Sequence, residues 1–451
     1  MRAFEPLVPG EVSIYLCGAT VQSEPHIGHV RSSVNFDILR RWLQHGGTNV
    51  IYIRNVTDID DKILTKSAAA GWPWWAWALR HERAFTWAYD TLGCLPPTYE
   101  PRATGHITEM VSLIDRLIST GHAYSADGDV YFDVSGFPGY GALSRQRMED
   151  MHPAPDSASQ AKRDPRDFAL WKAAKPGEPS WPTPWGDGRP GWHLECSAMA
   201  AKYCGESFDI HGGGMDLVFP HHENERAQSQ AAGDGFARYW LHNAWVTVGG
   251  QKMGKSLGNA LLIRALLRDV RPVELRYYLS AAHYRSMIEY SPEALAEAAT
   301  GYRRIESFVK RATEVVGPAQ PPAALPDGFT SAMEDDLGVP AALAVMHNLV
   351  STGNSQLSSG SVQQLPEILG QVRAMAAILG FDPDDSHWST GADAYQPLAG
   401  ALVEDLLQQR RQARQERDFA TADAIRARLT ALGVEIEDAP TGTRWSLRRE
   451  G

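Results

Sequence analysis

Two short apolar runs that flank a helical pattern constrain the fold of this chain most strongly. Residues 12–17 predict a buried strand, residues 29–43 a helix, and residues 49–53 a second strand. A strand, a helix and a strand within about 40 residues are typical of a βαβ unit, whose two strands pair in parallel. We therefore predict an α/β protein with a parallel sheet and a ligand-binding crevice at the carboxyl ends of its strands.

Two segments of the chain are expected to face this crevice. Cys17 ends the first predicted strand, and residues 55–62 follow the second. The carboxyl ends of parallel strands meet at one edge of a sheet, so side chains from both segments should lie near each other.

A turn with two histidines opens the predicted helix. It contains His26, Gly28 and His29. A helix N-terminus attracts anions through its unpaired N–H groups, and two histidines there can donate to phosphate oxygens. The alternative interpretation is that both histidines are ordinary polar residues of a turn.

A second loop concentrates positive charge. Lys252 and Lys255 are two of only nine lysines in the chain, and they lie in a glycine-rich segment that ends at Ser256. Two ammonium groups on such a loop suit the negative charge that grows during phosphoryl chemistry. The spacing does not match a Walker P-loop, and the alternative is a solvated basic turn.

A third group of residues has the composition of a metal site. His221 and Glu225 are four residues apart, so on a helix their side chains point the same way. With two cysteine thiolates they would form a Cys₂-His-Glu zinc site. Cys196 is one candidate, and Cys17 is favoured as the second because it lies at the crevice, but the residues alone leave that choice open. A zinc-protease helix is disfavoured because Arg226 replaces the second histidine of His-Glu-x-x-His. The alternative is that the histidines here are hydrogen-bonded polar residues.

Charge and targeting signals narrow the class of protein. The formal net charge is −11, which argues against non-specific coating of nucleic acid. Residues 410–428 nevertheless carry six arginines against three acidic residues, and such a local basic face suits a phosphate backbone. No transmembrane segment or export signal is visible, and the four cysteines form no CxxC pair, so reduced thiols in the cytoplasm are expected.

Two further stretches allow simple structural expectations. Residues 72–92 carry five tryptophans in a helical pattern, which we interpret mainly as core packing. Residues 351–361 are rich in serine and glycine and predict a flexible connection.

Together these motifs resemble those of class I aminoacyl-tRNA synthetases. Residues 26–29 and 252–256 are similar to the HIGH and KMSKS motifs of that family, and the surrounding sequence resembles cysteinyl-tRNA synthetases in particular. The resemblance extends over nearly the whole chain. The similar segments are residues 15–21, 55–62, 191–199, 208–225 and 417–426.

The resemblance implies a role for each matching residue. The zinc ligands of the family fall on Cys17, Cys196, His221 and Glu225. The residues that handle ATP fall on His26, Gly28, His29, Lys252, Lys255 and Ser256, of which the histidines and lysines are the catalytic ones. Asp216 matches a position near the ribose, and Thr57 and Trp192 match positions that line the cysteine pocket with Cys17.

The resemblance also implies the domain organisation. A Rossmann-like catalytic domain would be split by a connective insertion and followed by a helical bundle and a small anticodon-binding domain. The implied boundaries are residues 1–100 and 191–245 for the catalytic domain, 101–190 for the insertion, 246–300 for the KMSKS-loop stem-contact region, 301–395 for the bundle and 396–451 for the C-terminal domain.

The implied reaction is the two-step charging of tRNA(Cys). ATP would convert L-cysteine to cysteinyl-adenylate, which then esterifies the 3′-terminal adenosine of the tRNA. One Zn²⁺ would bind the substrate thiol, and Mg²⁺ would accompany ATP. The resemblance further implies a cytoplasmic monomer that contacts no membrane.

The sequence departs from the family pattern at two places. Gly254 replaces the usual serine of the KMSKS loop, and the N-terminus is shorter than is common in the family.

Two alternative functions remain. One is the related ligase that joins cysteine to an amino-sugar inositol in mycothiol synthesis. The other is a non-catalytic RNA-binding module, which the intact catalytic motifs disfavour.

Overall fold

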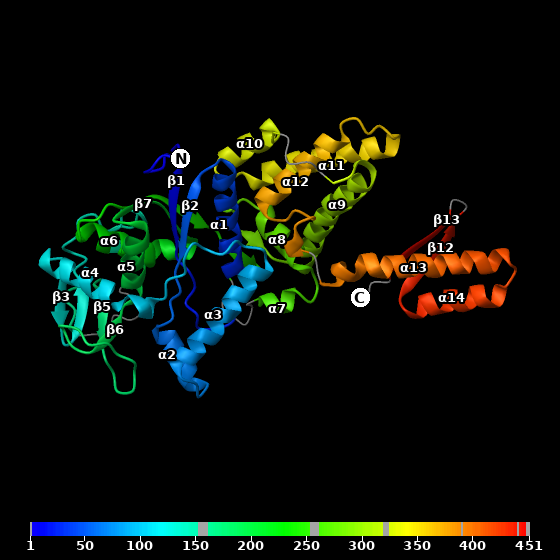
Figure 1. The fold of residues 1–451 in the computed structure, drawn as a ribbon. Coiled ribbons are helices and arrows are strands. Elements are labelled where there is room, and N and C mark those ends of the chain that lie inside the picture. The colour runs from blue at the N-terminus through cyan, green and yellow to red at the C-terminus, as the bar shows by residue number, and fades with distance from the viewer. Residues whose placement is uncertain are drawn as a thin grey trace. The chain divides into compact units, whose positions relative to one another are not determined.

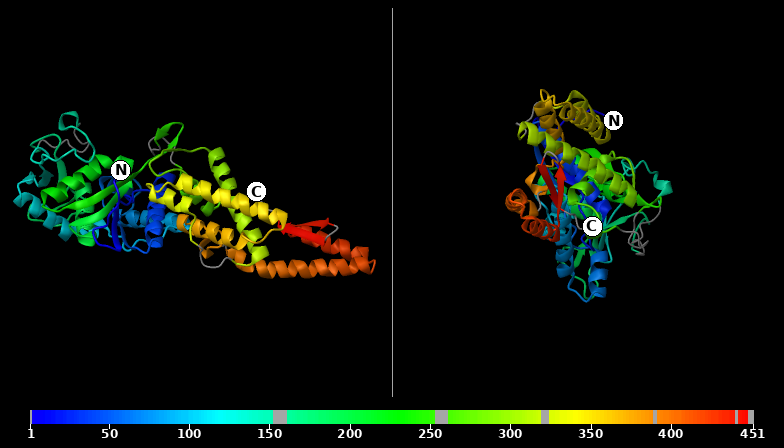
Figure 2. Two further views of the ribbon diagram at one scale, coloured as in Figure 1. Left: turned by 90° about the horizontal axis from the view of Figure 1, so that it is seen from above. Right: turned by 90° about the vertical axis from the view of Figure 1, so that its right-hand side faces the viewer.

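A computed structural model gives the fold of this protein. It describes residues 2–151, 161–252, 261–318, 324–388, 391–439 and 442–447. Contacts within the chain divide it into two compact units, Met1–Pro383 and Asp384–Gly451, and each is described by itself. Figures 1 and 2 show the helices and strands of both units.

The core of the first unit is a four-stranded sheet in the order β2-β1-β7-β8. Its strands are β1 (Glu11–Leu16), β2 (Asn49–Arg54), β7 (Ser207–Gly214) and β8 (Phe236–Asn243), and every neighbouring pair is parallel. Helix α1 (Ile27–His45) connects β1 to β2, which confirms the predicted βαβ unit and the α/β class.

Alternation along β1 explains why both faces of this sheet are covered. Val12, Ile14 and Leu16 belong to one buried cluster, together with Phe36 and Leu39 of α1. Tyr15 belongs to a second cluster, which includes residues of α5 (Trp192–Cys204) and α6 (Glu223–Ala231). The sheet therefore lies between α1 on one side and α5 and α6 on the other (Figure 1).

A second sheet is inserted between β2 and β7. Strands β3 (Ala123–Ala126), β4 (Asp129–Phe132), β5 (Phe168–Ala173) and β6 (Gly188–Pro190) form it in chain order and pair in antiparallel fashion. Helices α2 (Asp61–Ala69), α3 (Trp74–Thr91) and α4 (Ile107–Ser119) precede it.

A small sheet and two short helices follow β8. Strand β9 (Val246–Val248) pairs with both β10 (Gln251–Lys252) and β11 (Ile288–Glu289). Helices α7 (Ile263–Leu266) and α8 (Pro272–Ala281) lie between β10 and β11 in the sequence.

The first unit ends in a helical bundle. Its helices are α9 (Pro292–Val316), α10 (Asp327–Glu334), α11 (Val339–Ser359) and α12 (Leu365–Leu379). The predicted flexible connection at 351–361 was wrong, because α11 continues to Ser359. Ser355 and Ser358 donate to the carbonyls four residues earlier, and Gly353 lies against Phe308. Burial of the helix face has overridden the low helix propensity of serine and glycine.

The described residues of the second unit form a short 3₁₀ turn (Ser386–Trp388), two α-helices and a hairpin. Helices α13 (Gly391–Gln415) and α14 (Phe419–Ala431) share a small core with the antiparallel strands β12 (Val434–Ala439) and β13 (Gly442–Leu447). Asp418 caps α14 by accepting from the Thr421 N–H at 3.1 Å, which separates the two helices.

The tryptophan-rich stretch is only partly a core element. Trp75 is 60% exposed and Trp72 is 43% exposed, so the core interpretation was wrong for these two residues. Trp74, by contrast, contacts Trp181 of the insertion with ring centroids 6.5 Å apart.

In the described part of the chain, no helix is long and apolar enough to cross a membrane.

Candidate active site and metal centre

The carboxyl ends of β1 and β2 are held together directly after the strands finish. The Gly18 N–H donates to Asn55 Oδ1 at 2.8 Å. A Cβ at position 18 would lie 1.7 Å from the Asn55 carbonyl oxygen, so only glycine permits this approach. Cys17 is joined to β7 in turn, because its N–H donates to the Gly212 carbonyl at 3.0 Å. The ends of β1, β2 and β7 therefore meet around Cys17. This confirms that Cys17 and the segment after β2 lie together, and it adds the end of β7 to them.

The four predicted zinc ligands lie in one buried group. Cys17 Sγ is 3.6 Å from Cys196 Sγ, 3.5 Å from His221 Nε2 and 3.3 Å from Glu225 Oε1. His221 Nε2 lies 3.0 Å from Glu225 Oε1, although a short irregular turn with a cis peptide bond before Pro220 precedes α6. The four donor atoms all lie within 4.8 Å of one another.

These separations fit a tetrahedral metal shell. Zinc binds sulfur at about 2.3 Å and nitrogen or oxygen at about 2.0–2.2 Å, which corresponds to donor–donor distances of about 3.3–3.8 Å in a tetrahedron. The three distances from Cys17 fall inside this interval, and the His221–Glu225 distance of 3.0 Å is a few tenths shorter. The residues present therefore fit a zinc ion without rearrangement of the backbone.

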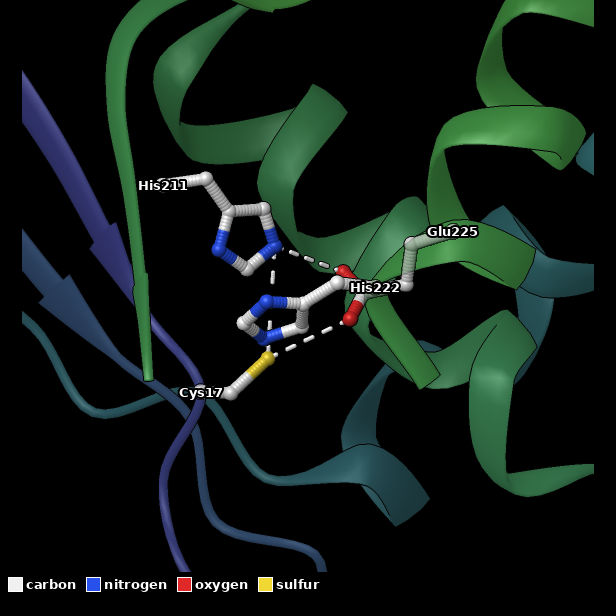
Figure 3. A group of neighbouring side chains, drawn as sticks. All are labelled: Cys17, His211, His222 and Glu225. Carbon is white, nitrogen blue, oxygen red and sulfur yellow. Dashed lines mark hydrogen bonds and ion pairs between the residues drawn. The ribbon is translucent and has the colours of Figure 1, made fainter. Parts of the chain in front are cut away.

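A second donor set overlaps the first. Figure 3 shows it: Cys17, His211, His222 and Glu225 come from the end of β1, from β7 and from the start of α6. The two sets share Cys17 and Glu225, so they provide for one ion and not two. His211 Nε2 lies 2.8 Å from Glu225 Oε2 and 4.0 Å from Cys17 Sγ, so its close contact is with the carboxylate. Only the first set offers two sulfur donors.

The electrostatics of the group favour a divalent cation. Burial raises the pKa of Cys17 well above its ordinary value, and Cys196 raises it further. Burial also opposes ionisation of Cys196, but the Cys17 thiol and His221 stabilise its thiolate and lower its pKa to about 6. Burial disfavours the Glu225 carboxylate too, yet His211 and His221 hold its pKa well below the usual range. Burial opposes protonation of His221, yet Glu225 and Cys196 raise its pKa to about 10, so this buried group attracts positive charge, which a divalent cation would supply.

The predicted phosphate-binding turn is a capped helix N-terminus. His26 Nδ1 accepts from the Gly28 N–H at 3.2 Å, and His29 Nδ1 accepts from the His26 N–H at 3.2 Å. A ring nitrogen that accepts carries a lone pair, so in both neutral rings the proton resides on Nε2. The capping bonds therefore occupy the Nδ1 atoms of both rings at the N-terminus of α1, and the ring centroids lie 3.7 Å apart.

The segment that follows the predicted lysine loop (residues 252–256) is hydrogen-bonded to this histidine turn. Lys252 ends β10, whereas Lys255 and Ser256 lie outside the described residues. Beyond them, the Ile27 N–H donates to the Leu261 carbonyl at 3.0 Å, and the Ile263 N–H donates to the Pro25 carbonyl at 3.4 Å. The chain that follows the lysine loop is thus paired directly with the histidine turn.

The remaining predicted residues lie around the metal cluster and the strand ends. The Trp192 ring stacks on His221 with centroids 4.3 Å apart. Thr57 is buried and pairs with the loop after β1, because its N–H donates to the Ala19 carbonyl at 3.3 Å. Asp216 follows β7, and its Oδ1 accepts from the Trp245 indole N–H at 3.3 Å.

Two histidines of the site were missed from the sequence. His211 holds the second oxygen of Glu225, and His193 Nδ1 lies 2.9 Å from His221 Nδ1. Burial and the neighbouring His221 keep the pKa of His193 well below its ordinary value, so it remains neutral and directs His221 Nε2 toward the cluster. One signal was available for His211, because a histidine near the end of an apolar strand lies at the same sheet edge as Cys17.

Comparison with known proteins gives the family. Residues 3–300 match the model described as tRNA synthetases class I (C) catalytic domain. Residues 328–381 match the DALR domain, and residues 397–445 match the cysteinyl-tRNA ligase anticodon binding domain.

Similar full-length proteins agree with these matches. A cysteine–tRNA ligase of Streptomyces avermitilis is 59% identical over 451 residues, which cover 99% of this chain and 97% of that protein. One from Streptomyces coelicolor is 59% identical over 452 residues and is covered to 74%. In fold, the chain is similar to Mycobacterium tuberculosis methionyl-tRNA synthetase in complex with methionyl-adenylate, with a TM-score of 0.63, 16% identity, and coverage of 84% of this chain and 92% of that one. The chain therefore belongs to the cysteinyl-tRNA ligase family of class I aminoacyl-tRNA synthetases.

Proposed function

We propose that this chain is a cysteine–tRNA ligase that activates L-cysteine with ATP and transfers it to tRNA(Cys). The observation that carries the proposal is the buried group of Cys17, Cys196, His221 and Glu225 at the same sheet edge as the turn with His26. One half of this edge suits a thiol, and the other half suits the phosphates of a nucleotide.

The Cys₂-His-Glu group would hold one Zn²⁺. The metal would supply a Lewis-acid site that binds the substrate thiol as its thiolate. Trp192 lies against the imidazole of His221 and would form one wall of the cysteine pocket, with Thr57 at the neighbouring strand end. Serine differs from cysteine only by oxygen in place of sulfur, and a pocket that relies on shape separates such pairs poorly. Selection through the thiol makes a separate editing domain unnecessary.

The histidine turn would receive ATP. The Nε2–H groups of His26 and His29, fixed by the capping bonds, donate to phosphate oxygens, and the N-terminus of α1 adds its unpaired N–H groups. Gly28 allows the nucleotide to approach the backbone, Asp216 would bind the ribose, and Ser256 would contribute to ATP binding.

In the first step a carboxylate oxygen of cysteine attacks the α-phosphorus of ATP. The bond from this phosphorus to the bridging oxygen breaks, and pyrophosphate leaves with its electron pair. Lys252 and Lys255 would neutralise the charge that grows on the leaving group, and Mg²⁺ would accompany ATP. In the second step a hydroxyl of the 3′-terminal adenosine attacks the carbonyl carbon, and AMP leaves.

The Arg-rich C-terminal unit would bind tRNA. Arg411, Arg414, Arg417, Arg426 and Arg428 are exposed, whereas Arg410 is only 5% exposed and does not contribute to a basic surface. Binding through a few local cations should fall steeply with salt. We further propose the six residue ranges given above for the domains, a monomer and a cytoplasmic location.

Cysteine-dependent exchange of pyrophosphate into ATP tests the first step. Supply of tRNA or of the amino-sugar inositol then identifies the acceptor. Exchange followed by charging of tRNA(Cys) supports the proposal. Exchange with transfer only to the amino sugar would identify the mycothiol ligase instead, and absence of exchange would leave an RNA-binding module.

A further inference from the structure

A fully buried arginine lies directly behind the histidine turn. Arg31 is on α1, two residues after His29, and its relative exposure is 0%. Its Nη1 donates to the carbonyls of Ala244 at 2.8 Å and Trp245 at 2.7 Å. Its Nη2 donates to the carbonyls of His283 at 3.2 Å and Ser286.

The acceptors of this guanidinium are unusual for a buried cation. In the part of the chain that the structure describes, all four are main-chain carbonyl oxygens and none is a carboxylate. Burial lowers the pKa of Arg31 to about 10, so the group is still charged at neutral pH. Desolvation of an unpaired charge costs free energy that an apolar side chain would avoid. In return, the planar guanidinium holds several acceptors in a fixed arrangement, which a single-point donor could not do.

The four carbonyls belong to two segments that begin the same small sheet. Ala244 and Trp245 directly precede β9, and His283 and Ser286 lie just before β11. The two segments are also bonded to each other, through the Ala244 N–H to the Tyr284 carbonyl at 2.8 Å and the Ile288 N–H to the Trp245 carbonyl at 3.0 Å. Arg31 therefore clamps α1 to the point where β9 and β11 start. Strand β9 continues into β10, which ends at Lys252.

A residue of the helical bundle also binds the segment before β11. Asp336, between α10 and α11, accepts from Arg285 Nε at 2.6 Å and from the Tyr284 hydroxyl at 2.7 Å. Its carbonyl lies 2.9 Å from His283 Nε2. The loop 283–286 is thus bonded to Arg31 on α1 and to Asp336 of the bundle.

We propose that Arg31 is a positioning residue that holds the β9–β11 sheet, which carries Lys252, against the helix that carries His26 and His29. This inference rests on the proposed function, because it concerns alignment of the two phosphate-binding elements. Among the described residues, the hydrogen bonds of Arg31 go to main-chain carbonyls outside the metal cluster. Its loss should therefore impair the reaction at the phosphates and leave recognition of the cysteine thiol intact.

Kinetics of the full chain with zinc bound test this proposal. Arg31→Gln and Arg31→Lys are compared in cysteine-dependent ATP–pyrophosphate exchange, with cysteine and ATP each varied. A misplacement of about 1 Å can cost about 100-fold in rate, so we expect kcat to fall by about 100-fold in Arg31→Gln. Arg31→Lys should lose at least about 10-fold, since one ammonium group cannot reach both segments. The KM for cysteine and the zinc content should change less than about twofold in both variants.

Arg276→Lys is the matched control. Arg276 of α8 is also 0% exposed and also binds α1, but through the Asp37 carboxylate. Among the described residues, its other hydrogen-bond partners lie outside the β9–β11 sheet. This variant should lower the thermal midpoint and keep kcat within about threefold of wild type. If kcat falls equally in Arg276→Lys, the effect of the Arg31 substitutions reflects loss of stability alone, and the proposal is overturned.

Asp336→Asn keeps the proposal testable if both Arg31 variants fail to fold. Asparagine tolerates the left-handed backbone at this position, where φ is 56°. It removes the negative charge and replaces one of the two acceptor oxygens that bind Arg285 by an amide donor. We expect a smaller fall in kcat with unchanged KM for cysteine. Wild-type kcat in folded Arg31 variants, or in Asp336→Asn when those do not fold, would overturn the inference. Absence of exchange in the wild-type protein would instead refute the proposed function itself.

Discussion

Replacement of Asp37 by asparagine should strongly destabilise the first unit in a pH-dependent way. Asp37 lies on α1, is 3% exposed, and joins three parts of the fold. Its Oδ2 accepts from Arg276 Nη2 of α8 at 2.5 Å and from Arg41 Nε at 2.8 Å. Its Oδ1 accepts from the Leu95 N–H at 2.8 Å, in the loop after α3.

The magnitude follows from the bonds that asparagine keeps and loses. The amide oxygen can still accept from Leu95, but the amide N–H groups would face two guanidinium donors. Removal of one partner of a buried ion pair costs about 3–5 kcal/mol. Arg276 keeps its bonds to the Leu92 carbonyl at 2.9 Å and the Leu379 carbonyl at 3.1 Å, so we expect the lower limit, about 3 kcal/mol.

The sign of the pH dependence follows from the pKa of Asp37. Burial alone would raise this pKa, but Arg276 and Arg41 outweigh burial and hold it below the ordinary value of 3.8. As the pH falls, the unfolded chain therefore takes up the proton first. The contribution of Asp37 to stability is fully present above about pH 4 and disappears as the pH falls through the lower, folded-state pKa. The difference between wild type and Asp37→Asn should thus be largest at neutral pH and narrow below about pH 4.

Urea unfolding between pH 7 and pH 3, followed by tryptophan fluorescence, measures this difference. Asp234→Asn is the control, because Asp234 is equally buried but pairs with Arg116, whose side chain is 42% exposed. Solvent screening should limit that loss to about 1 kcal/mol. A loss below about 1 kcal/mol in Asp37→Asn, or one that stays constant across the pH range, would refute this account of the ion pair.

Four further substitutions test the site. Cys196→Ser should remove bound zinc and cysteine-dependent exchange together, with Cys204→Ser as the control that keeps both; a zinc-free variant that still rejects serine would contradict the role of the metal. His26→Ala should lower kcat for exchange by about 100-fold or more through loss of one phosphate donor, with little change in the KM for cysteine. Gly18→Ala should destabilise the folded chain by more than about 2 kcal/mol in urea unfolding, because its Cβ would clash with the Asn55 carbonyl at 1.7 Å. Gly254→Ser should change kcat or the KM for ATP modestly, because serine reduces backbone freedom; identical kinetics would refute this effect.

The elements and residues that could be predicted are those that form a recognisable pattern along the sequence. The βαβ unit is visible in two apolar runs, and His221 and Glu225 are visible as a pair four residues apart. Arg31 is different, because its acceptors are main-chain carbonyls more than 200 positions away, and a carbonyl carries no residue identity. His193 was missed for a related reason: its role is to hold another histidine, and that contact depends on how α5 packs against the start of α6. Sequence spacing thus indicates the groups that touch a ligand better than the groups that orient them.

The short path from Cys17 to His26 explains how one strand serves both halves of the proposed reaction. In that reaction the thiol of cysteine is bound at the cluster around Cys17, and its carboxylate must meet the α-phosphate held at His26. The spacing between the two depends on residues 18–25, and two main-chain hydrogen bonds to Thr57, after β2, hold the first part of that loop. The Val21 N–H donates to the Thr57 carbonyl at 3.1 Å, and the Thr57 N–H donates to the Ala19 carbonyl at 3.3 Å. Because these hydrogen bonds constrain the connection, the proposed alignment of the two reacting groups would be established when the strands pair and would not have to be found after the substrates bind.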